Sequence, residues 1–317
     1  MRLVPIIASI ALSALAIPVS HAAREQPGAA QSQTLKKDYL KRHGLQIRVQ
    51  EGGWGTADAK EIETVLYSTA TELLERFPGK RLNSIVVTHT DKNPVVLYER
   101  GPNDEYRVYL TAKGRRWPVY AYEFAHELSH ILTNYQHHTY PNATTYNQWF
   151  EETLCEVASL YTLKRLAVTW EIAPPHPQWA VYAPDFQAFA EEFLQEKHRK
   201  LPSTTNLANW FQQNQNDMKR NPYLRGHNEV VANLLLPLFE ENPEIWEAIT
   251  YLNMDLKGNT FKGYMQSWHD NVPEEFKDII RHMMVSFGML KSGDAAETIA
   301  SDPSEGRQPG AAGRAAQ

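Results

Sequence analysis

The chain of 317 residues contains a single cysteine, Cys155. An intramolecular disulfide is therefore excluded, and the fold has to be stabilised by a large apolar core, which a chain of this length can bury. Secreted eukaryotic proteins of this size often carry disulfides. If the protein is exported, the lack of a cysteine pair favours a bacterial periplasm.

A strong excess of either charge is also absent, since 32 Lys and Arg residues accompany 37 Asp and Glu residues and the formal net charge is −5. This balance argues against nucleic acid and against an anionic membrane surface as partners. The sequence has no internal repeat, and its composition does not indicate an oligomeric state.

Only one long apolar run is present, over residues 3–17, directly after Arg2. Its roughly 15 residues are fewer than the 20 or so that a membrane-spanning helix needs, and no Lys/Arg cluster follows. The small residues Ser20 and Ala22 suit a signal peptidase. We therefore predict a signal peptide over residues 1–22 and an exported protein, periplasmic or secreted, without a membrane span after cleavage.

The remaining chain divides into four parts by its pattern. Residues 23–43 predict a flexible lead-in, and residues 291–317, rich in Gly, Ala, Ser and Pro, predict a disordered tail. Residues 44–117 show period-two alternation and turn chemistry, which predicts a small, mostly antiparallel sheet lobe. Residues 118–290 carry apolar residues at helical spacing and predict a mostly α-helical lobe. We expect an α+β fold in which both lobes form one catalytic unit.

The expected elements can be placed along the chain. The predicted strands cover residues 44–50, 82–88, 94–99 and 106–111. The predicted helices cover 57–77 (capped by Thr56), 118–136, 148–169, 183–198, 205–218, 227–240, 242–253, 260–270 and 273–289.

A His-Glu-x-x-His motif, His126-Glu127-Leu128-Ser129-His130, begins the helical lobe. Histidines one helical turn apart project from one face and can bind one metal ion. The apolar residues of this helix share the opposite face, so both histidines would face a cleft. Two exposed histidines without a metal are the alternative. Glu127, however, stands where a zinc hydrolase needs a base to take the proton of water in the fourth zinc position.

The next helix offers three carboxylates, Glu151, Glu152 and Glu156. Glu152 and Glu156 share a face with buried leucines, whereas Glu151 projects about 100° away, toward a wetter side. A buried carboxylate needs a partner, and a zinc ion with its histidines supplies one. We expect His126, His130 and Glu152 to bind one Zn²⁺, Glu156 to orient a ligand histidine, and Glu151 to be a solvated acid.

This arrangement resembles the gluzincin metallopeptidases, which include thermolysin and an aminopeptidase group. Residues 149–154, Trp-Phe-Glu-Glu-Thr-Leu, resemble the aminopeptidases' Trp-Leu-Asn-Glu-Gly-Phe, whose zinc-binding glutamate matches Glu152. The spacing of Glu152 and Glu156 is similar to thermolysin's Glu-x-x-x-Asp, where the second acid supports a zinc histidine. The resemblance covers roughly residues 106–170. It implies a gluzincin-like fold in which the strand over 106–111 is the sheet edge that aligns the substrate.

Three departures limit the resemblance. Glu151 replaces the usual asparagine, Thr153 replaces the usual glycine or alanine, and the aminopeptidases' Gly-x-Met-Glu-Asn motif is absent. The aminopeptidase activity therefore does not transfer to this chain.

Gluzincins commonly use a His or Tyr from the distal lobe to stabilise the developing oxyanion. Here His227 or Tyr223, at the start of a strongly apolar helix, is the candidate donor, and Arg225 is a candidate partner for a substrate carboxylate. The alternative is that His227 and Asn228 only cap this helix.

The sequence thus predicts a secreted zinc metallopeptidase that acts on a peptide or protein substrate. Two alternatives stay open. The first is a non-catalytic, peptidase-like binding or assembly module of the cell envelope, against which the intact Glu127 argues. The second is a zinc amidase that acts on cell-wall peptide.

Overall fold

The computed structural model describes residues 43–77, 79–139, 145–254 and 260–291. The predicted signal peptide, the lead-in up to residue 42 and the tail from residue 292 lie outside the described residues. Among the helices that the structure describes, none is both long and apolar enough to cross a membrane.

The sheet is small and mixed. Its strands are β1 (Ile47–Val49), β2 (Ile85–His89), β3 (Val95–Val96) and β4 (Tyr106–Leu110), in the spatial order β1-β2-β4-β3. β1 pairs with β2 and β2 pairs with β4 in parallel, whereas β3 pairs with β4 antiparallel. The α+β class is confirmed, but the expectation of a mostly antiparallel sheet is wrong.

Helix α2 (Ala59–Leu74) explains the first parallel pair, because it connects β1 to β2. A helical crossover returns the chain to the same end of the sheet, so the next strand runs parallel to the first. The helix begins with a capping box, in which Asp58 accepts from the Lys60 N–H at 2.8 Å and Glu61 accepts from the Asp58 N–H. The expected cap, Thr56, therefore lies too early in the chain.

The edge strand beside the metal-motif helix is β3, not the strand at 106–111. β4 lies between β2 and β3, and β3 faces α3 (Trp117–Leu132) at the open edge. The Val96 N–H of β3 donates to Glu127 Oε2 of α3 at 2.7 Å. A strand was predicted over residues 94–99, but its place at the edge beyond β4 depends on long-range pairing, which the local pattern does not specify.

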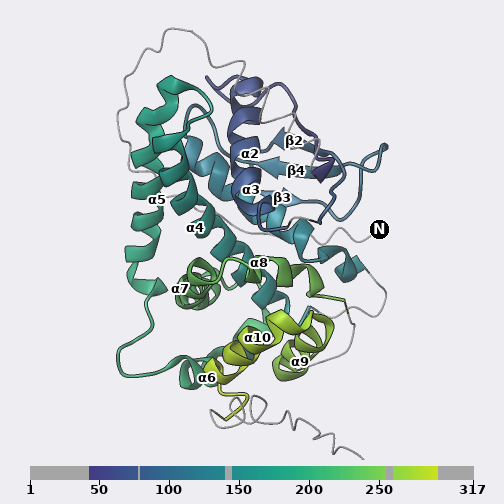
Figure 1. The fold of residues 1–317 in the computed structure, drawn as a ribbon, viewed down its shortest axis with the longest axis vertical. Coiled ribbons are helices and arrows are strands. Elements are labelled where there is room, and N and C mark those ends of the chain that lie inside the picture. Colours follow the sequence, from purple (N-terminus) through teal and green to yellow (C-terminus); the bar gives the residue numbers. More distant parts are fainter. Residues whose placement is uncertain (1–42, 78, 140–144, 255–259, 292–317) are drawn as a thin grey trace, which may run out of the picture.

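The helical part is arranged around α4 (Gln148–Ile172), which contacts α2, α3, α5 and α7 (Figure 1). One continuous cluster of buried apolar residues extends from the sheet through these helices, so both lobes share a core. The remaining helical elements are η1 (Tyr135–Thr139), η2 (Pro177–Tyr182), α5 (Ala183–Gln195), η3 (Lys197–Arg199), α6 (Leu207–Arg220), α7 (Arg225–Glu241), α8 (Ile245–Ala248), η4 (Ile249–Tyr251), α9 (Phe261–Asn271) and α10 (Glu274–Ser286).

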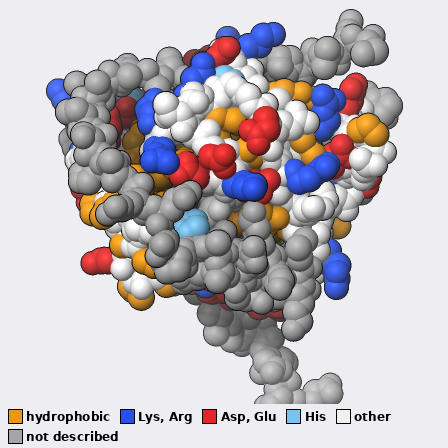
Figure 2. Space-filling model, turned by 90° about the horizontal axis from the view of Figure 1, so that it is seen from above, with side chains coloured by type: hydrophobic (Ala, Val, Ile, Leu, Met, Phe, Trp, Pro, Cys, Tyr) orange, Lys and Arg blue, Asp and Glu red, His pale blue; other side chains and the backbone are white. Residues whose placement is uncertain are grey.

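Acidic and basic side chains are interspersed on the face that Figure 2 shows, without a large area of one sign. This distribution agrees with the small net charge of the chain.

The capping box of α2 yields a stability prediction. Asp58→Ala should lower the free energy of unfolding by about 1 kcal/mol, because the first turn loses the acceptor for a backbone N–H. Urea denaturation followed by circular dichroism measures this change. Glu51→Ala, which removes an exposed acid outside the helix, is the control. Equal losses in the two variants would contradict a specific capping role.

Candidate metal centre

Helix α3 is buried almost all round, because every residue except Pro118 is shielded by the sheet, α2 or α4. The expected division into an apolar back and an open histidine face is therefore too simple. The His130 side chain is fully buried, and the His126 side chain retains 11% exposure. Access to the motif is therefore from the His126 side.

The structure brings the three predicted ligands together. His126 Nε2 lies 3.3 Å from Glu152 Oε2, and His130 Nε2 lies 3.7 Å from Glu152 Oε1. Zinc bonds of 2.0–2.1 Å in a tetrahedron place neighbouring ligand atoms about 3.3–3.4 Å apart. His130 Nε2 and Glu152 Oε1 are buried without a hydrogen-bond partner. A metal ion between these atoms would satisfy both, so the residues fit a metal.

The predicted ligands meet because α3 and α4 pack antiparallel in a fixed register. Tyr122 donates to Glu156 Oε2 at 2.5 Å, and one turn further along α3, His126 meets Glu152, one turn back along α4. Ser159 Oγ also donates to the Tyr122 carbonyl at 2.9 Å. Residues four apart share a helix face, so this register brings the motif histidines to Glu152.

Glu151, not Glu156, contacts a histidine of the motif. The Glu151 side chain is fully buried, with Oε1 2.7 Å from His130 Nδ1 and Oε2 3.0 Å from His138 Nε2. Asn253 Nδ2 donates to Oε2 at 2.7 Å. Burial alone would raise the pKa of Glu151, but His138 and His130 hold it well below its usual range. Glu151 is thus an ionised carboxylate that fixes His130, and the expectation that it faces solvent is wrong.

Glu156 belongs to a separate ion-pair network. Arg199 Nη1 donates to Glu156 Oε1 at 2.6 Å, and Arg199 Nη2 donates to Glu229 Oε1 at 2.8 Å. Burial would raise the pKa of Glu156, but Arg199 and Arg225 lower it. Glu156 therefore anchors α3, through Tyr122, to η3 and α7, and the expected contact with a ligand histidine is absent from its contacts in the described part of the chain.

Glu127 lies beside the ligands with one oxygen held and one without a partner. Oε2 accepts the Val96 N–H, while Oε1 is buried without a hydrogen bond. Burial raises the pKa of Glu127, and His126 and His130 act in the opposite direction. The carboxylate is therefore oriented by the sheet edge and has one oxygen available to accept a proton.

Tyr223, one of the two expected oxyanion donors, lies near the ligands. Its hydroxyl accepts from Gln148 Nε2 at 3.1 Å, and Gln148 is one turn before Glu152 on α4. Burial, followed by the nearby Glu152, raises the pKa of Tyr223 to about 12. The phenol is therefore neutral at pH 7. Because the Gln148 bond uses its oxygen, its hydrogen can be donated elsewhere.

His227, the other expected donor, contacts α6 instead. Its Nε2 lies 3.0 Å from Asn214 Oδ1, and its ring packs 5.6 Å from that of Trp210. Arg225 bonds to Glu229, so its charge is already paired and is not free to bind a substrate carboxylate. Of Tyr223, His227 and Arg225, the structure brings only Tyr223 close to the predicted ligands, as the effect of Glu152 on its pKa shows.

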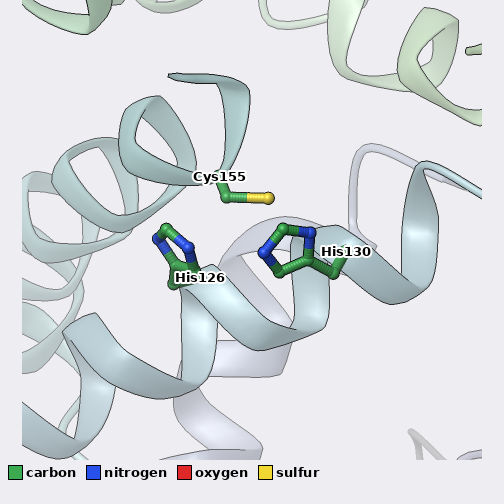
Figure 3. A group of neighbouring side chains, drawn as sticks. All are labelled: His126, His130 and Cys155. Carbon is green, nitrogen blue, oxygen red and sulfur yellow. The ribbon is translucent and has the colours of Figure 1, made fainter. Parts of the chain in front are cut away.

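Cys155 completes a tight group with the two histidines. One ligand atom from each of His126, His130 and Cys155 lies within 4.8 Å of the others. Figure 3 shows the sulfur directed toward the His130 ring from α4. Burial raises the pKa of the Cys155 thiol to about 12, although His130 lowers it. Glu152 contacts His126 through Oε2 and His130 through Oε1, whereas Cys155 places a single sulfur near both histidines.

Within the described ranges of the chain, two further groups of side chains with metal-ligand chemistry lie outside this centre. His137 and His138 adjoin Glu151, which already bonds to His130. Glu196, His198 and Glu229 form the other group, in which arginines pair with both carboxylates. Their charges are thus largely neutralised, which makes the His126–His130 centre the better metal site.

Tyr98 is a neighbour of the site that the sequence did not indicate. Its ring stacks on Tyr135 at 5.6 Å and meets His138 edge-on at 6.3 Å. Burial raises the pKa of Tyr98, and Glu151 and Tyr223 raise it further. The one available signal was its position in the predicted strand over residues 94–99, two residues after the observed end of β3.

No protein-family model, curated protein or solved structure matches the chain.

The contact between Glu151 and His130 yields a prediction for metal affinity. Glu151→Gln should weaken zinc binding by about 10- to 100-fold, because His130 loses the carboxylate that orients it and increases its basicity. Competition with a chromophoric chelator measures the affinity. Glu156→Gln, the same substitution five residues further along α4, should reduce stability but leave zinc affinity nearly unchanged. A larger loss of affinity in Glu156→Gln would contradict these roles.

Proposed function

We propose that the protein is an exported zinc-dependent metallopeptidase of gluzincin type. One observation carries the proposal: buried, unpartnered His130 Nε2 and Glu152 Oε1 face each other beside His126, and Glu127 presents its own unpartnered Oε1. A core does not normally leave buried polar atoms unsatisfied without a functional reason.

The donor set supports zinc as the metal. Two imidazole nitrogens and one carboxylate, from His126, His130 and Glu152, are a common protein ligand set of catalytic zinc in peptidases. Carboxylates and water alone would instead suit Mg²⁺ or Ca²⁺. Glu151 supplies the outer hydrogen bond that a ligand histidine usually has.

The residues divide the work of hydrolysis. When bound, zinc would polarise the scissile carbonyl and lower the pKa of water. Glu127 Oε1 accepts the proton of the attacking water and can pass it to the leaving amine, while the Val96 N–H holds Oε2 in place. The Tyr223 hydroxyl donates to the oxyanion, and Gln148 orients it.

The sheet edge next to Glu127 supports a peptide as substrate. Directly after β3, the Leu97 N–H donates to the Arg107 carbonyl of β4 at 2.9 Å, whereas the Val96 N–H points to the opposite side, where it donates to Glu127 Oε2. An extended peptide can add to such an edge through backbone hydrogen bonds. The edge and the proton acceptor therefore lie together, as cleavage of a peptide bond requires.

The burial of the centre favours one alternative, a non-catalytic metal-binding module of the cell envelope. The His130 and Glu151 side chains are fully buried, and Glu152 retains 6% exposure. A peptide library, incubated with zinc-loaded protein with and without a chelator, distinguishes the two functions. Chelator-sensitive cleavage supports the peptidase, and an undigested library with stoichiometric zinc supports the module. A zinc amidase would cleave cell-wall peptide in the same assay.

Glu127→Gln tests the proton acceptor. The variant should keep one zinc per chain and lose about 10²- to 10⁴-fold in kcat, because the amide cannot accept the proton. Zinc content by elemental analysis and initial rates on a peptide substrate measure the two effects.

Glu123→Gln is the matched control, since Glu123 is another buried carboxylate of α3 that accepts backbone N–H groups, from Thr111 and Ala112. Burial raises the pKa of Glu123 to about 7, so an amide resembles its protonated form. Its kcat per zinc should stay near that of the wild type. Unchanged activity in Glu127→Gln would contradict the role of Glu127.

Tyr223→Phe tests the oxyanion donor. Removal of the hydroxyl should lower kcat by about 10²- to 10³-fold with little change in KM, because the donor acts on charge that develops in the transition state. Steady-state kinetics on one peptide separates these constants. His227→Ala should leave kcat unchanged, since His227 contacts Asn214 and Trp210. The reverse pattern would restore His227 as the donor.

A further inference from the structure

Helix α4 directs a third potential ligand toward the motif histidines. Cys155 lies three residues after Glu152, so their side chains share a helix face. Its sulfur points from α4 over the His130 ring (Figure 3). The side chain is fully buried, in a centre where His126 alone of the three exceeds 1% residue exposure.

The separations suit coordination. The three ligand atoms of Cys155, His126 and His130 lie within 4.8 Å of one another, so a point between them is at most about 2.8 Å from each. Zn–S bonds of about 2.3 Å and Zn–N bonds of about 2.0–2.1 Å require each atom to move by less than about 1 Å. Small side-chain rotations supply such a movement.

A second observation points independently to a ligand at the same place. His130 Nε2 and Glu152 Oε1 have no hydrogen-bond partner, and their side chains retain 0% and 6% exposure. His130 uses Nδ1 for Glu151, so only Nε2 remains for a metal. The sulfur therefore lies over the His130 ring, with which the thiol interacts electrostatically, rather than in an apolar pocket.

We propose that Cys155 is a metal ligand and the fourth protein donor of this centre, with His126, His130 and Glu152. The inference rests on the proposed metal site but goes beyond the peptidase function. On binding, the thiol loses its proton to solvent and the sulfur forms a bond to the metal, with no change of oxidation state.

Four protein donors define a resting form of the site. Structural zinc sites are closed by four protein ligands, whereas catalytic sites keep one position for water. Hydrolysis would therefore require Cys155 to leave, and Glu152, His126 and His130 would then form the three-ligand catalytic set. Thiolate coordination also favours soft metals such as zinc over magnesium or calcium.

Cobalt substitution tests the proposal on the full chain. Co²⁺ bound by thiolate gives an intense near-ultraviolet charge-transfer band, which nitrogen and oxygen ligands do not produce. Co²⁺-loaded wild type should show this band with one cobalt per chain, and Cys155→Ser and Cys155→Ala should lack it. Both variants should also bind zinc roughly 10- to 100-fold more weakly.

Thr162→Ala is the matched control, because Thr162 is a buried polar residue on the same helix, about two turns beyond Cys155, with no hydrogen bond from its Oγ1. It should keep both the band and the affinity. Circular dichroism of each apo variant verifies folding, and the two replacements at Cys155 guard against a failure of one to fold.

The possible failures are distinguishable. The role of Cys155 would be overturned if wild type bound one cobalt without a thiolate band and bound zinc only as tightly as Cys155→Ala does. That result would leave the proposed His₂Glu site intact. Wild type that binds neither cobalt nor zinc would overturn both proposals.

Discussion

The antiparallel contact of α3 with α4 is the constraint on which the site depends. Tyr122 meets Glu156 and His126 meets Glu152 in steps of one helical turn, so a shift of one residue between the helices would separate every pair. One turn before Glu152 on α4, Gln148 donates a hydrogen bond to the hydroxyl of Tyr223. The register that packs the two central helices therefore also sets the distance between the metal ligands.

This contact is stable only because each buried carboxylate has its own partners. Glu156 is neutralised by Arg199, and Glu151 by His130 and His138. Glu123 and Glu127 of α3 accept backbone N–H groups at the ends or edges of strands. A buried ion without a partner would destabilise the fold by several kcal/mol. Replacement of one member of a buried ion pair should therefore lower the stability more than replacement of both members. Glu127 and Glu152 differ from the other buried carboxylates, since each has one oxygen without a hydrogen-bond partner in the described residues.

That His126, His130 and Glu152 bind a metal stays a prediction. The sequence was sufficient to predict that these side chains lie together, because fixed helical spacing and a carboxylate in need of a partner are local properties. It was insufficient for the roles of Glu151 and Glu156. Those assignments assumed that α4 has a wet side, whereas α4 is enclosed by α2, α3, α5 and α7 and is buried along most of its length. Apolar residues at all angles of this helix were the available signal. The sheet order and the contact of His227 with α6 depend on long-range pairing, which local patterns do not specify.

Asn253 has a consequence for how the molecule opens. It adopts a left-handed backbone conformation (φ 59°), donates to Glu151 and to the Thr133 carbonyl, and accepts from Tyr264 of α9 at 2.7 Å. The turn after η4 and helix α9 are thereby connected to His130 through Glu151. Local opening of this C-terminal segment would leave the histidine without its fixed carboxylate. If the proposed metal binds at His130, its affinity and the protection of α9 amide hydrogens from exchange would be thermodynamically linked, although α9 contributes none of the proposed ligands.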